Sequence, residues 1–535
     1  SGAGIGTGYG SQSDAEITIT ESTVKAVGGT GAAIGSGSEG DVFSPPTGDP
    51  NTFKTIIRIT DSNVTASSGP SAAIGSGSYS TNATEIHING GKIEASNYSG
   101  SAIGSGDSAK GKTGIYITGS NVTATADIGT GIGSGTSSSG ETTIDISGGT
   151  VTAMGGGDGY DGSAGIGSGS HSTGYTHITL HDGVTVKATG GGNSSLGGGG
   201  GAGIGSGNRA KGNTDILIKG ATKVTAKGGS TAAGIGSGNG SNGSTIINIE
   251  GGTITAEGGG KENGSCQASG AGIGSGGNAL NKTTINIKGG EITATGGVSL
   301  DSRNHSDKWL SGAGIGSGSN VSGETEINIS GDSTIKSASG GKYGGAGIGS
   351  GSYSGSTPDS KKGAVTINIT DGTITEATGG SDYVDYVSSS ERWYSGAGIG
   401  AGLNAGTTTI NIKDNAHIVS ATGGKYGGAG IGSGSGDTKN DSKKGAVTIN
   451  ITDGTIEKAE GKDGGAGIGS GYYGRSSTVN ISGNAELKDV KGGNLAAGIG
   501  SGYDSGKVDV VIDGGTIKAT GGDSAAGIGS GHNSR

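Results

Sequence analysis

The chain repeats one pattern of apolar and polar positions along its whole length. Its most regular element is the motif GAGIGSG, which stands in this form at residues 201–207 and recurs with small changes. The sixteen copies of Ile-Gly-x-Gly begin at Ile5, Ile34, Ile74, Ile103, Ile132, Ile166, Ile204, Ile235, Ile273, Ile315, Ile348, Ile399, Ile431, Ile468, Ile499 and Ile528. Successive copies lie 29 to 51 residues apart, and 29 is the most frequent spacing. A fixed minimum with variable excess predicts a repeating unit that carries loop insertions.

Two further strand patterns follow the glycine motif in each repeat, as in TTINIKGG at 283–290 and GEITATGG at 290–297. Isoleucine alternates here with polar residues, which is the period of a half-buried strand. Gly-Gly or Asp-Gly pairs mark the corners. Three short strands per repeat predict an all-β fold, a right-handed parallel β-helix (β-solenoid) of about 15 coils of 29 or more residues.

Inward side chains of one coil are expected to stack on those of the next, for example Ile285 on Ile327 and Ile273 on Ile315. The core should be thin and aliphatic, because the chain contains only two Phe, two Trp and one Met. We expect one continuous solenoid over residues 1–535, with long corner insertions at 38–54, 297–312, 352–363 and 380–396. Both ends fall within a repeat, so the sequence is expected to be an excerpt of a longer chain.

Composition and charge then narrow the possible functions. Glycine contributes 129 of 535 residues, the formal net charge is −10, and Lys and Arg form no run. Nucleic acid is therefore excluded as a partner, because a basic stripe is needed to replace phosphate counterions. No apolar run reaches membrane-spanning length, which predicts no membrane insertion of this segment. The one cysteine, Cys266, allows no disulfide within the chain, and no cofactor or metal site is predicted.

The glycines of the motif form the first candidate surface. In an extended strand, Ala202, Ile204 and Ser206 would point to one face and Gly203 and Gly205 would leave the other face bare. The hexad GAGIGS resembles the GAGAGS repeat of silk fibroin, whose glycine faces pack together. This resemblance implies self-association, or contact with another flat surface, through a packing face of Gly203, Gly205, Gly272, Gly274, Gly314, Gly316, Gly347 and Gly349. Alternatively, the glycines only satisfy the backbone geometry of a tight side of the coil.

The second strand of each repeat carries a row of outward asparagines. The row consists of Asn248, Asn286, Asn328, Asn368, Asn411, Asn450 and Asn480. Stacked amides in register can hydrogen-bond from coil to coil, which favours a structural ladder. A flat Thr/Asn face is also compatible with binding to ice or crystalline polysaccharide. The neighbouring Thr-x-Thr pairs partly resemble ice-binding solenoids, but charged residues interrupt them.

In the early repeats, ionisable residues replace these asparagines. Arg58, His87, Tyr116 and Asp145 take the asparagine positions, and Glu85 lies beside His87. Such residues on one face of a β-helix could perform acid/base catalysis on a polysaccharide. An exposed strand face would have the same composition without catalysis, and the sequence indicates no groove wall. We therefore predict no catalytic residues and a protein that is not an enzyme.

Aromatic residues gather in the longest insertions and beside them. The candidate glycan-binding residues are Trp309, Tyr343, Trp393, Tyr394 and Tyr426, because exposed rings can stack on sugars or anchor a protein. Alternatively, these rings fold back over the ends of the aliphatic core. The stretch GGGDGYDGSAG at 155–165 is similar to a calcium-binding Gly/Asp turn, but it is not repeated as such a site requires.

Together, GGTITAEGG at 251–259, SGAGIGSG at 269–276 and TTINIKGG resemble the tandem glycine-rich β-helix repeats of anaerobic Gram-positive bacteria. Proteins with such repeats are large, lie at the cell surface or are secreted, and are described as adhesin-like or carbohydrate-binding. The resemblance implies an extracellular or cell-surface location and transfers no catalytic residues. It favours a non-enzymatic structural or adhesive rod, acting as stalk, fibre or surface scaffold and packing laterally through the glycine face. The alternatives are a carbohydrate-binding β-helix that uses the aromatic corner, an ice-binding protein, and a polysaccharide lyase or hydrolase.

Overall fold

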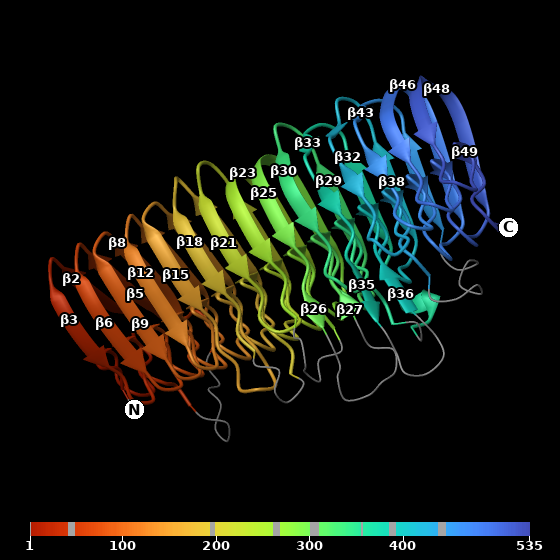
Figure 1. The fold of residues 1–535 in the computed structure, drawn as a ribbon. Coiled ribbons are helices and arrows are strands. Elements are labelled where there is room, and N and C mark those ends of the chain that lie inside the picture. Colours follow the sequence, from red (N-terminus) through yellow and green to blue (C-terminus); the bar gives the residue numbers. More distant parts are fainter. Residues whose placement is uncertain are drawn as a thin grey trace. The chain divides into compact units, whose positions relative to one another are not determined.

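The computed structural model describes residues 2–40, 49–192, 198–260, 268–299, 310–354, 357–384, 392–436 and 446–534. Contacts divide the chain into two compact units, Ser1–Ile254 and Thr255–Arg535. In the described ranges, regular structure is β-strand apart from one 3-10 turn at Asp359–Lys361. Nearly all strand pairs are parallel, which confirms the predicted all-β, parallel β-helix fold (Figure 1). Over the same ranges, no helix has the length and apolar character needed to cross a membrane.

The coils of the first unit contain three rows of parallel strands. The first row consists of Ile-Gly pairs: β1 (Ile5–Gly6), β4 (Ile34–Gly35), β7 (Ile74–Gly75), β10 (Ile103–Gly104), β13 (Ile132–Gly133), β16 (Ile166–Gly167), β19 (Ile204–Gly205) and β22 (Ile235–Gly236). The second row consists of β2 (Ala15–Thr20), β5 (Lys54–Thr60), β8 (Ala83–Asn89), β11 (Thr113–Thr118), β14 (Thr142–Ser147), β17 (Thr176–His181), β20 (Thr214–Ile218) and the first part of β23 (Thr245–Glu257), whose last three residues belong to the second unit. The third row consists of β3 (Thr23–Val27), β6 (Asn63–Ser68), β9 (Lys92–Asn97), β12 (Asn121–Ala126), β15 (Thr150–Met154), β18 (Thr185–Thr189) and β21 (Lys223–Lys227).

Equivalent residues of successive coils pair in register within this unit. Ile115 of β11 lies beside Ile144 of β14, and Val122 of β12 lies beside Val151 of β15. All four side chains are buried, so alternate residues of each strand build the core. Burial of one such aliphatic side chain stabilises the fold by about 1.5–3 kcal/mol. A thin stack of isoleucine, valine and alanine therefore suffices as a core.

The second unit repeats the three rows with more irregular corners. Its Ile-Gly strands are β24 (Ile273–Gly274), β28 (Ile315–Gly316), β31 (Ile348–Gly349), β37 (Ile399–Gly400), β41 (Ile431–Gly432), β45 (Ile468–Gly469), β47 (Ile499–Gly500) and β49 (Ile528–Gly529). The second row contains β29 (Thr325–Ile329), β32 (Val365–Ile369), β38 (Thr408–Ile412) and β42 (Val447–Ile451). The third row contains β30 (Thr334–Ser339), β33 (Thr373–Ile374), β34 (Ala377–Thr378), β39 (His417–Ile418), β40 (Ala421–Thr422), β43 (Thr455–Ile456) and β44 (Ala459–Glu460). Three long strands run through both rows: β25 (Thr283–Thr295), β46 (Ser477–Lys491) and β48 (Val508–Thr520).

The predicted stacking of inward residues is confirmed in this unit. Ile285 pairs with Ile327, and Ile273 pairs with Ile315. Two insertions form short antiparallel hairpins, β26 (Val298–Ser299) with β27 (Leu310–Ser311) and β35 (Ser381–Val384) with β36 (Arg392–Ser395). The core repeat therefore stays constant, and the insertions add separate structure at the corners.

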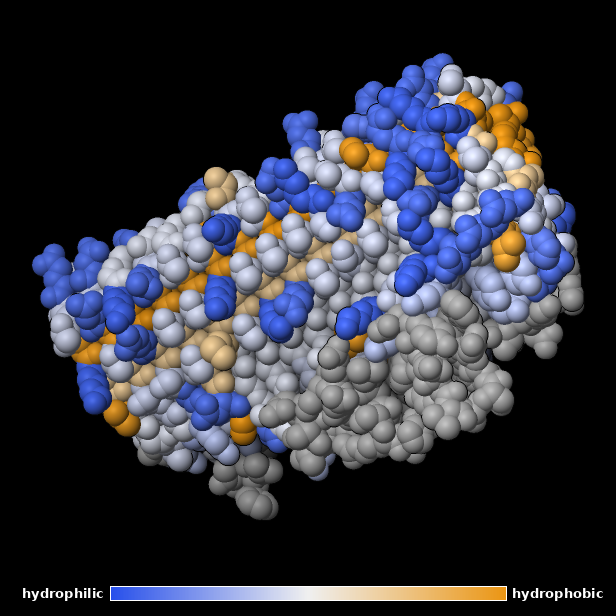
Figure 2. All heavy atoms as spheres, in the orientation of Figure 1, coloured by the Kyte–Doolittle hydropathy of each residue, from blue (hydrophilic) through white to orange (hydrophobic). Residues whose placement is uncertain are grey.

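Charged side chains are distributed unevenly over the surface. On the face of the second unit in Figure 2, hydrophilic residues gather around β43, β46 and β48. The ion pairs there include Lys488 with Glu457 (2.9 Å) and Lys458 with Glu460 (2.6 Å). On the visible face of the first unit, hydrophilic residues are separated by pale and orange rows. Exposed pairs of this kind contribute little to stability, so the fold depends on its core and its ladders.

Candidate functional site

The glycine motif is a tight bend and not an extended strand. Only its Ile-Gly pair joins the ladder, and the N–H of Ala202 donates to the carbonyl of Ser206 (3.0 Å), which closes the motif on itself. Gly205 has φ = 135°, a conformation that side chains other than glycine rarely adopt. A Cβ on Gly205 would overlap the carbonyl oxygen of Gly236 in the next coil. Glycine is therefore required here by both backbone conformation and coil spacing.

The predicted packing face is not on the surface. Its eight members, Gly203, Gly205, Gly272, Gly274, Gly314, Gly316, Gly347 and Gly349, are all buried. A Cβ on Gly203 would come within 2.8 Å of the backbone nitrogen of Lys227, so the chain itself covers this glycine. The outward placement expected from strand alternation is therefore wrong, because the motif bends where an extended strand was assumed. Lateral association of the protein stays a prediction, and it would need another surface.

The serine of the motif joins each coil to the next, a role that the sequence analysis missed. Its buried Oγ accepts a hydrogen bond from a glycine N–H of the following coil. The bonds run from Gly106 to Ser76 (3.1 Å), Gly135 to Ser105 (2.9 Å), Gly318 to Ser275 (3.1 Å) and Gly351 to Ser317 (3.1 Å). The signal was present in the sequence, since only Thr7 and Ala401 replace this serine among the sixteen motif copies.

The asparagine row of the second unit forms the predicted hydrogen-bonded ladder. Each Nδ2 donates to the Oδ1 of the asparagine one coil earlier. The bonds are Asn328 to Asn286 (2.9 Å), Asn368 to Asn328 (2.8 Å), Asn411 to Asn368 (2.8 Å), Asn450 to Asn411 (2.9 Å) and Asn480 to Asn450 (2.9 Å). Asn248, the first member of the predicted row, belongs to the first unit. The ladder amides thus bond along the stack, which fits a structural role.

In the first unit the same outward face carries ionisable residues. The register places Arg58, His87, Tyr116 and Asp145 side by side in that order, as predicted. The Nε2 of His87 lies 2.5 Å from Oε1 of Glu85, whose other oxygen pairs with Lys54. The hydrogen bond from Lys54 lowers the pKa of Glu85, and the bond from His87 adds to this effect. Glu85 is therefore an ionised carboxylate with two partners.

Asp145 is bonded to a different histidine. His181 Nε2 lies 2.8 Å from Asp145 Oδ1, and its Nδ1 lies 2.7 Å from Asp182 Oδ2. The hydrogen bond to Asp145 raises the pKa of His181, and the bond to Asp182 acts in the same direction. In the register, Tyr116 stands between His87 and Asp145. Asp145 is therefore separated from the contacting pair of Glu85 and His87.

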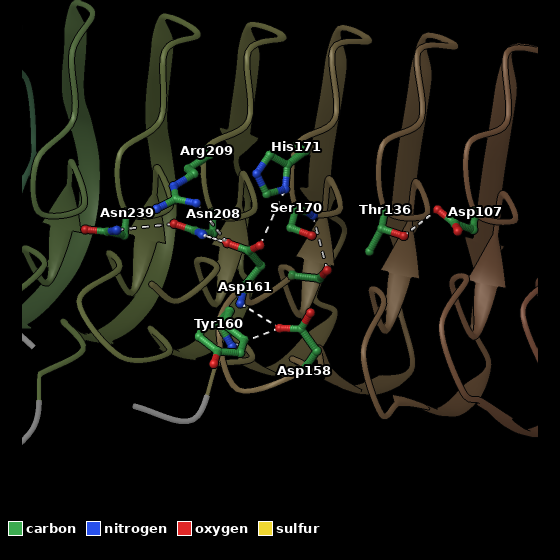
Figure 3. A network of polar contacts seen from close by, with 11 residues as sticks. Asp107, Thr136, Asp158, Tyr160, Asp161, Ser170, His171, Asn208, Arg209 and Asn239 are labelled. Carbon is green, nitrogen blue, oxygen red and sulfur yellow. Dashed lines mark hydrogen bonds and ion pairs between the residues drawn. The ribbon is translucent and has the colours of Figure 1, made fainter. Parts of the chain in front are cut away.

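The Gly/Asp stretch at 155–165 forms a polar cluster that links three coils (Figure 3). Asp158 Oδ1 accepts the N–H groups of Tyr160 (2.9 Å) and Asp161 (2.8 Å), which fixes a turn. The Asp161 carboxylate receives the side-chain amide of Asn208 and lies 3.8 Å from Nδ1 of His171.

The groups around the Asp161 carboxylate are nitrogen donors, which favour its negative charge and are not the oxygen ligands that calcium needs. Arg209 Nη1 lies 3.7 Å from the same carboxylate, so nitrogen donors approach it from three residues. Calcium requires six to eight oxygen ligands. Among the described residues, no group of three or more His, Cys, Asp or Glu is arranged to hold a metal. The cluster is a coil-to-coil clamp.

Two of the five candidate glycan-binding rings are folded inward. Tyr343 and Tyr394 are 6% and 7% exposed, their rings meet edge to face at 6.4 Å, and they pack on Leu403. This arrangement corresponds to the alternative in which rings cover the core, and it leaves these two rings little surface for a sugar. Tyr426 is half-buried, with Lys425 Nζ 5.2 Å from its ring centroid.

The rest of the aromatic prediction falls outside the described side chains. Trp309 and Cys266 lie outside the described residues, and for Trp393 only its place in β36 is described. Glycan binding at this corner stays a prediction.

A second aromatic row was missed by the sequence analysis. The rings of Tyr472 and Tyr503 stack at 5.1 Å with a 14° interplanar angle, and Tyr503 stacks on His532 at 5.5 Å and 3°. Each residue stands four positions after a motif isoleucine, a spacing that could have revealed the row. Because the rings cover each other's faces, this row also joins coils.

Comparison with known families agrees with the fold. A family model described as Beta helix repeat matches residues 17–38, 57–78, 86–107, 144–170, 216–239, 247–277, 285–319, 367–403, 449–472 and 510–532. Comparison with curated proteins and with solved structures returned no match. The repeat match and the parallel ladders show that the chain is a parallel β-helix repeat protein. This fold occurs in adhesive and carbohydrate-binding proteins and in lyases and hydrolases, so the site must decide among them.

Proposed function

We propose that this protein is a non-enzymatic structural and adhesive scaffold that acts outside the cell, at the cell surface. The observation that carries this proposal is the ladder from Asn286 to Asn480, in which one outward side chain of every coil bonds to its neighbour. The buried Ser–Gly bonds, such as that between Ser317 and Gly351, also join each coil to the next. Because the repeated residues bond successive coils to one another, they support a structural role for the protein.

The ionisable face of the first unit also supports a role without catalysis. A general acid and base must reach the same reacting bond. Here Glu85 is bonded to Lys54 and His87, and Asp145 is bonded to His181 on β17. These separate partners favour a set of surface ion pairs over an acid/base pair.

We propose that the insertions at the corners of the coils carry the adhesive function. Loops that vary around a rigid scaffold carry recognition in many repeat proteins. The two hairpin insertions, β26 with β27 and β35 with β36, add separate structure at corners of the second unit. The partners that we propose are glycans or another copy of the protein, contacted through corners and strand faces and not through the buried glycines.

Two assays on the purified protein test the two parts of this proposal. In the first, the protein is incubated with pectin, xylan, alginate and hyaluronan, and new reducing ends and unsaturated products are measured. In the second, beads coated with the protein are passed over surfaces coated with mucin, with each polysaccharide or with the protein itself. The proposal predicts retention of the beads without product.

Each part can fail separately. Product formation that disappears in Glu85→Gln/His87→Gln would show a catalytic function and overturn the first part. Equal retention of beads coated with an unrelated globular protein would overturn the adhesive part. Protease treatment of intact source cells should remove the protein, and full protection would contradict the surface location.

A further inference from the structure

Gly114 lines a hollow in the outward face of the first unit. It lies on β11 between Glu85 of β8 and Thr143 of β14, at a position where the neighbouring strands carry side chains. Ala83, also on β8, is a second small residue that lines this hollow. The hollow has a volume of about 250 Å³ and opens to solvent.

Two ion pairs form the rim of this hollow. Lys54 pairs with Glu85, and Lys112 Nζ lies 2.8 Å from Oε2 of Glu141. The hydrogen bonds from the two lysines lower the pKa of Glu85 and of Glu141, so both carboxylates are ionised. The rim therefore presents two ammonium groups and two carboxylates with no net charge, and all four side chains are partly exposed.

Tyr116 supplies an aromatic wall. A Cβ on Gly114 would lie 3.0 Å from Cε2 of Tyr116 and 3.3 Å from its hydroxyl, so the ring leans over the glycine. The His87 ring stacks against Tyr116 at 4.9 Å and 14°, which limits its movement. The tyrosine is 37% exposed, and its hydroxyl lies at the hollow.

The charges of the rim define the chemistry of a ligand. An anion would face Glu85 and Glu141, and a cation would face the two lysines. A hydroxyl group can accept from an ammonium and donate to a carboxylate, so it can bind without breaking either ion pair. The volume is below the range of about 300–1,000 Å³ that holds drug-sized ligands, which suits one small ring.

We propose that the hollow over Ala83 and Gly114 binds one neutral pyranose ring of a polysaccharide. The ring hydroxyls bond to the two Lys–Glu pairs, and the apolar face of the sugar lies against Tyr116. This site is distinct from the aromatic corner, and the proposal rests on the glycan-binding part of the proposed function. Failure of the sugar titration together with continued retention of the beads would overturn this site alone.

Titration with simple sugars tests the proposal. The probes are the methyl pyranosides of glucose, galactose, mannose and N-acetylglucosamine, with glucuronate and glucosamine as charged comparisons, followed by saturation-transfer NMR and calorimetry. We expect at least one neutral pyranoside to bind, and to bind more tightly than both charged sugars. Gly114→Val should weaken its binding at least about tenfold, because a Cβ at this position would lie 3.0 Å from Cε2 of Tyr116 and would displace the ring that forms the wall.

Two variants complete the design. Lys112→Met removes an ammonium from the rim without changing the strand, and it should also weaken binding, so the test holds even if Gly114→Val fails to fold. Thr123→Val on the neighbouring strand β12 alters an exposed position and should leave binding unchanged. Absence of neutral-sugar binding, tighter binding of a charged sugar, or unchanged binding in the folded Gly114→Val and Lys112→Met variants would overturn the proposal.

Discussion

The Oγ of Ser317 accepts a 3.1 Å hydrogen bond from the backbone N–H of Gly351 in the next coil. Ser317 is 1% exposed, so water cannot replace this bond. The same contact recurs in both units, for example between Ser76 and Gly106. The motif serine is thus a buried link between coils.

Replacement of this serine should destabilise the second unit. Ser317→Ala would leave the buried N–H of Gly351 without its acceptor, which costs about 1–3 kcal/mol of unfolding free energy. Urea-induced unfolding followed by circular dichroism measures this change. Ala401 occupies the equivalent place in another copy, so Ala401→Ser should be neutral or stabilising. Equal effects of the two substitutions would contradict the role of the serine.

Two glycine substitutions separate backbone strain from steric overlap. Gly205→Ala should cost more than about 3 kcal/mol, because its Cβ would meet the carbonyl of Gly236 in addition to an unfavourable φ. Gly119 also has a positive φ (61°), but a Cβ there has open space around it. Gly119→Ala should therefore cost only about 1–2 kcal/mol. Thermal unfolding of both variants makes the comparison, and similar losses would argue against the tight bend.

His181 should make stability depend on pH. Its pKa is raised in the folded state, mainly by the hydrogen bond to Asp145, so folding favours the protonated ring. Its contribution is fully present below the unfolded pKa of about 6.5 and is lost as pH rises through the folded value. His181→Gln should therefore destabilise the protein more at about pH 5.5 than at about pH 9.

A neighbouring substitution controls for other pH effects. Thr179→Val lies on the same strand and has no titrating group, so its effect should be equal at both pH values. If His181→Gln showed the same pH-independent loss, the pairing of His181 with Asp145 and Asp182 would be refuted.

The sequence allowed the fold and the registers to be predicted because both follow from short periods. Alternation of isoleucine with polar residues defined the inward rows, and one outward asparagine per repeat defined the ladder that includes Asn411. The ladder could be predicted because parallel coils in register bring identical residues together.

Other features depend on backbone conformation that residue order does not reveal. The glycine face was misplaced because alternation applies only to extended strands, whereas Gly205 has φ = 135° and the motif closes between Ala202 and Ser206. The partners of Asp145 were missed for a different reason. His181 pairs with Ser147 in the register, so its ring reaches Asp145 diagonally across two neighbouring strands, and this contact depends on side-chain conformation.

The most direct test of the scaffold account is the free energy of unfolding of Asn411→Ala compared with that of Thr409→Ala. Both residues point outward on β38, but only Asn411 bonds to asparagines on both sides. Loss of two net hydrogen bonds should lower the unfolding free energy by about 1–3 kcal/mol for Asn411→Ala. Thr409→Ala should change it by less than about 0.5 kcal/mol. Equal stability of the two variants would contradict the claim that the repeated outward side chains hold the coils together.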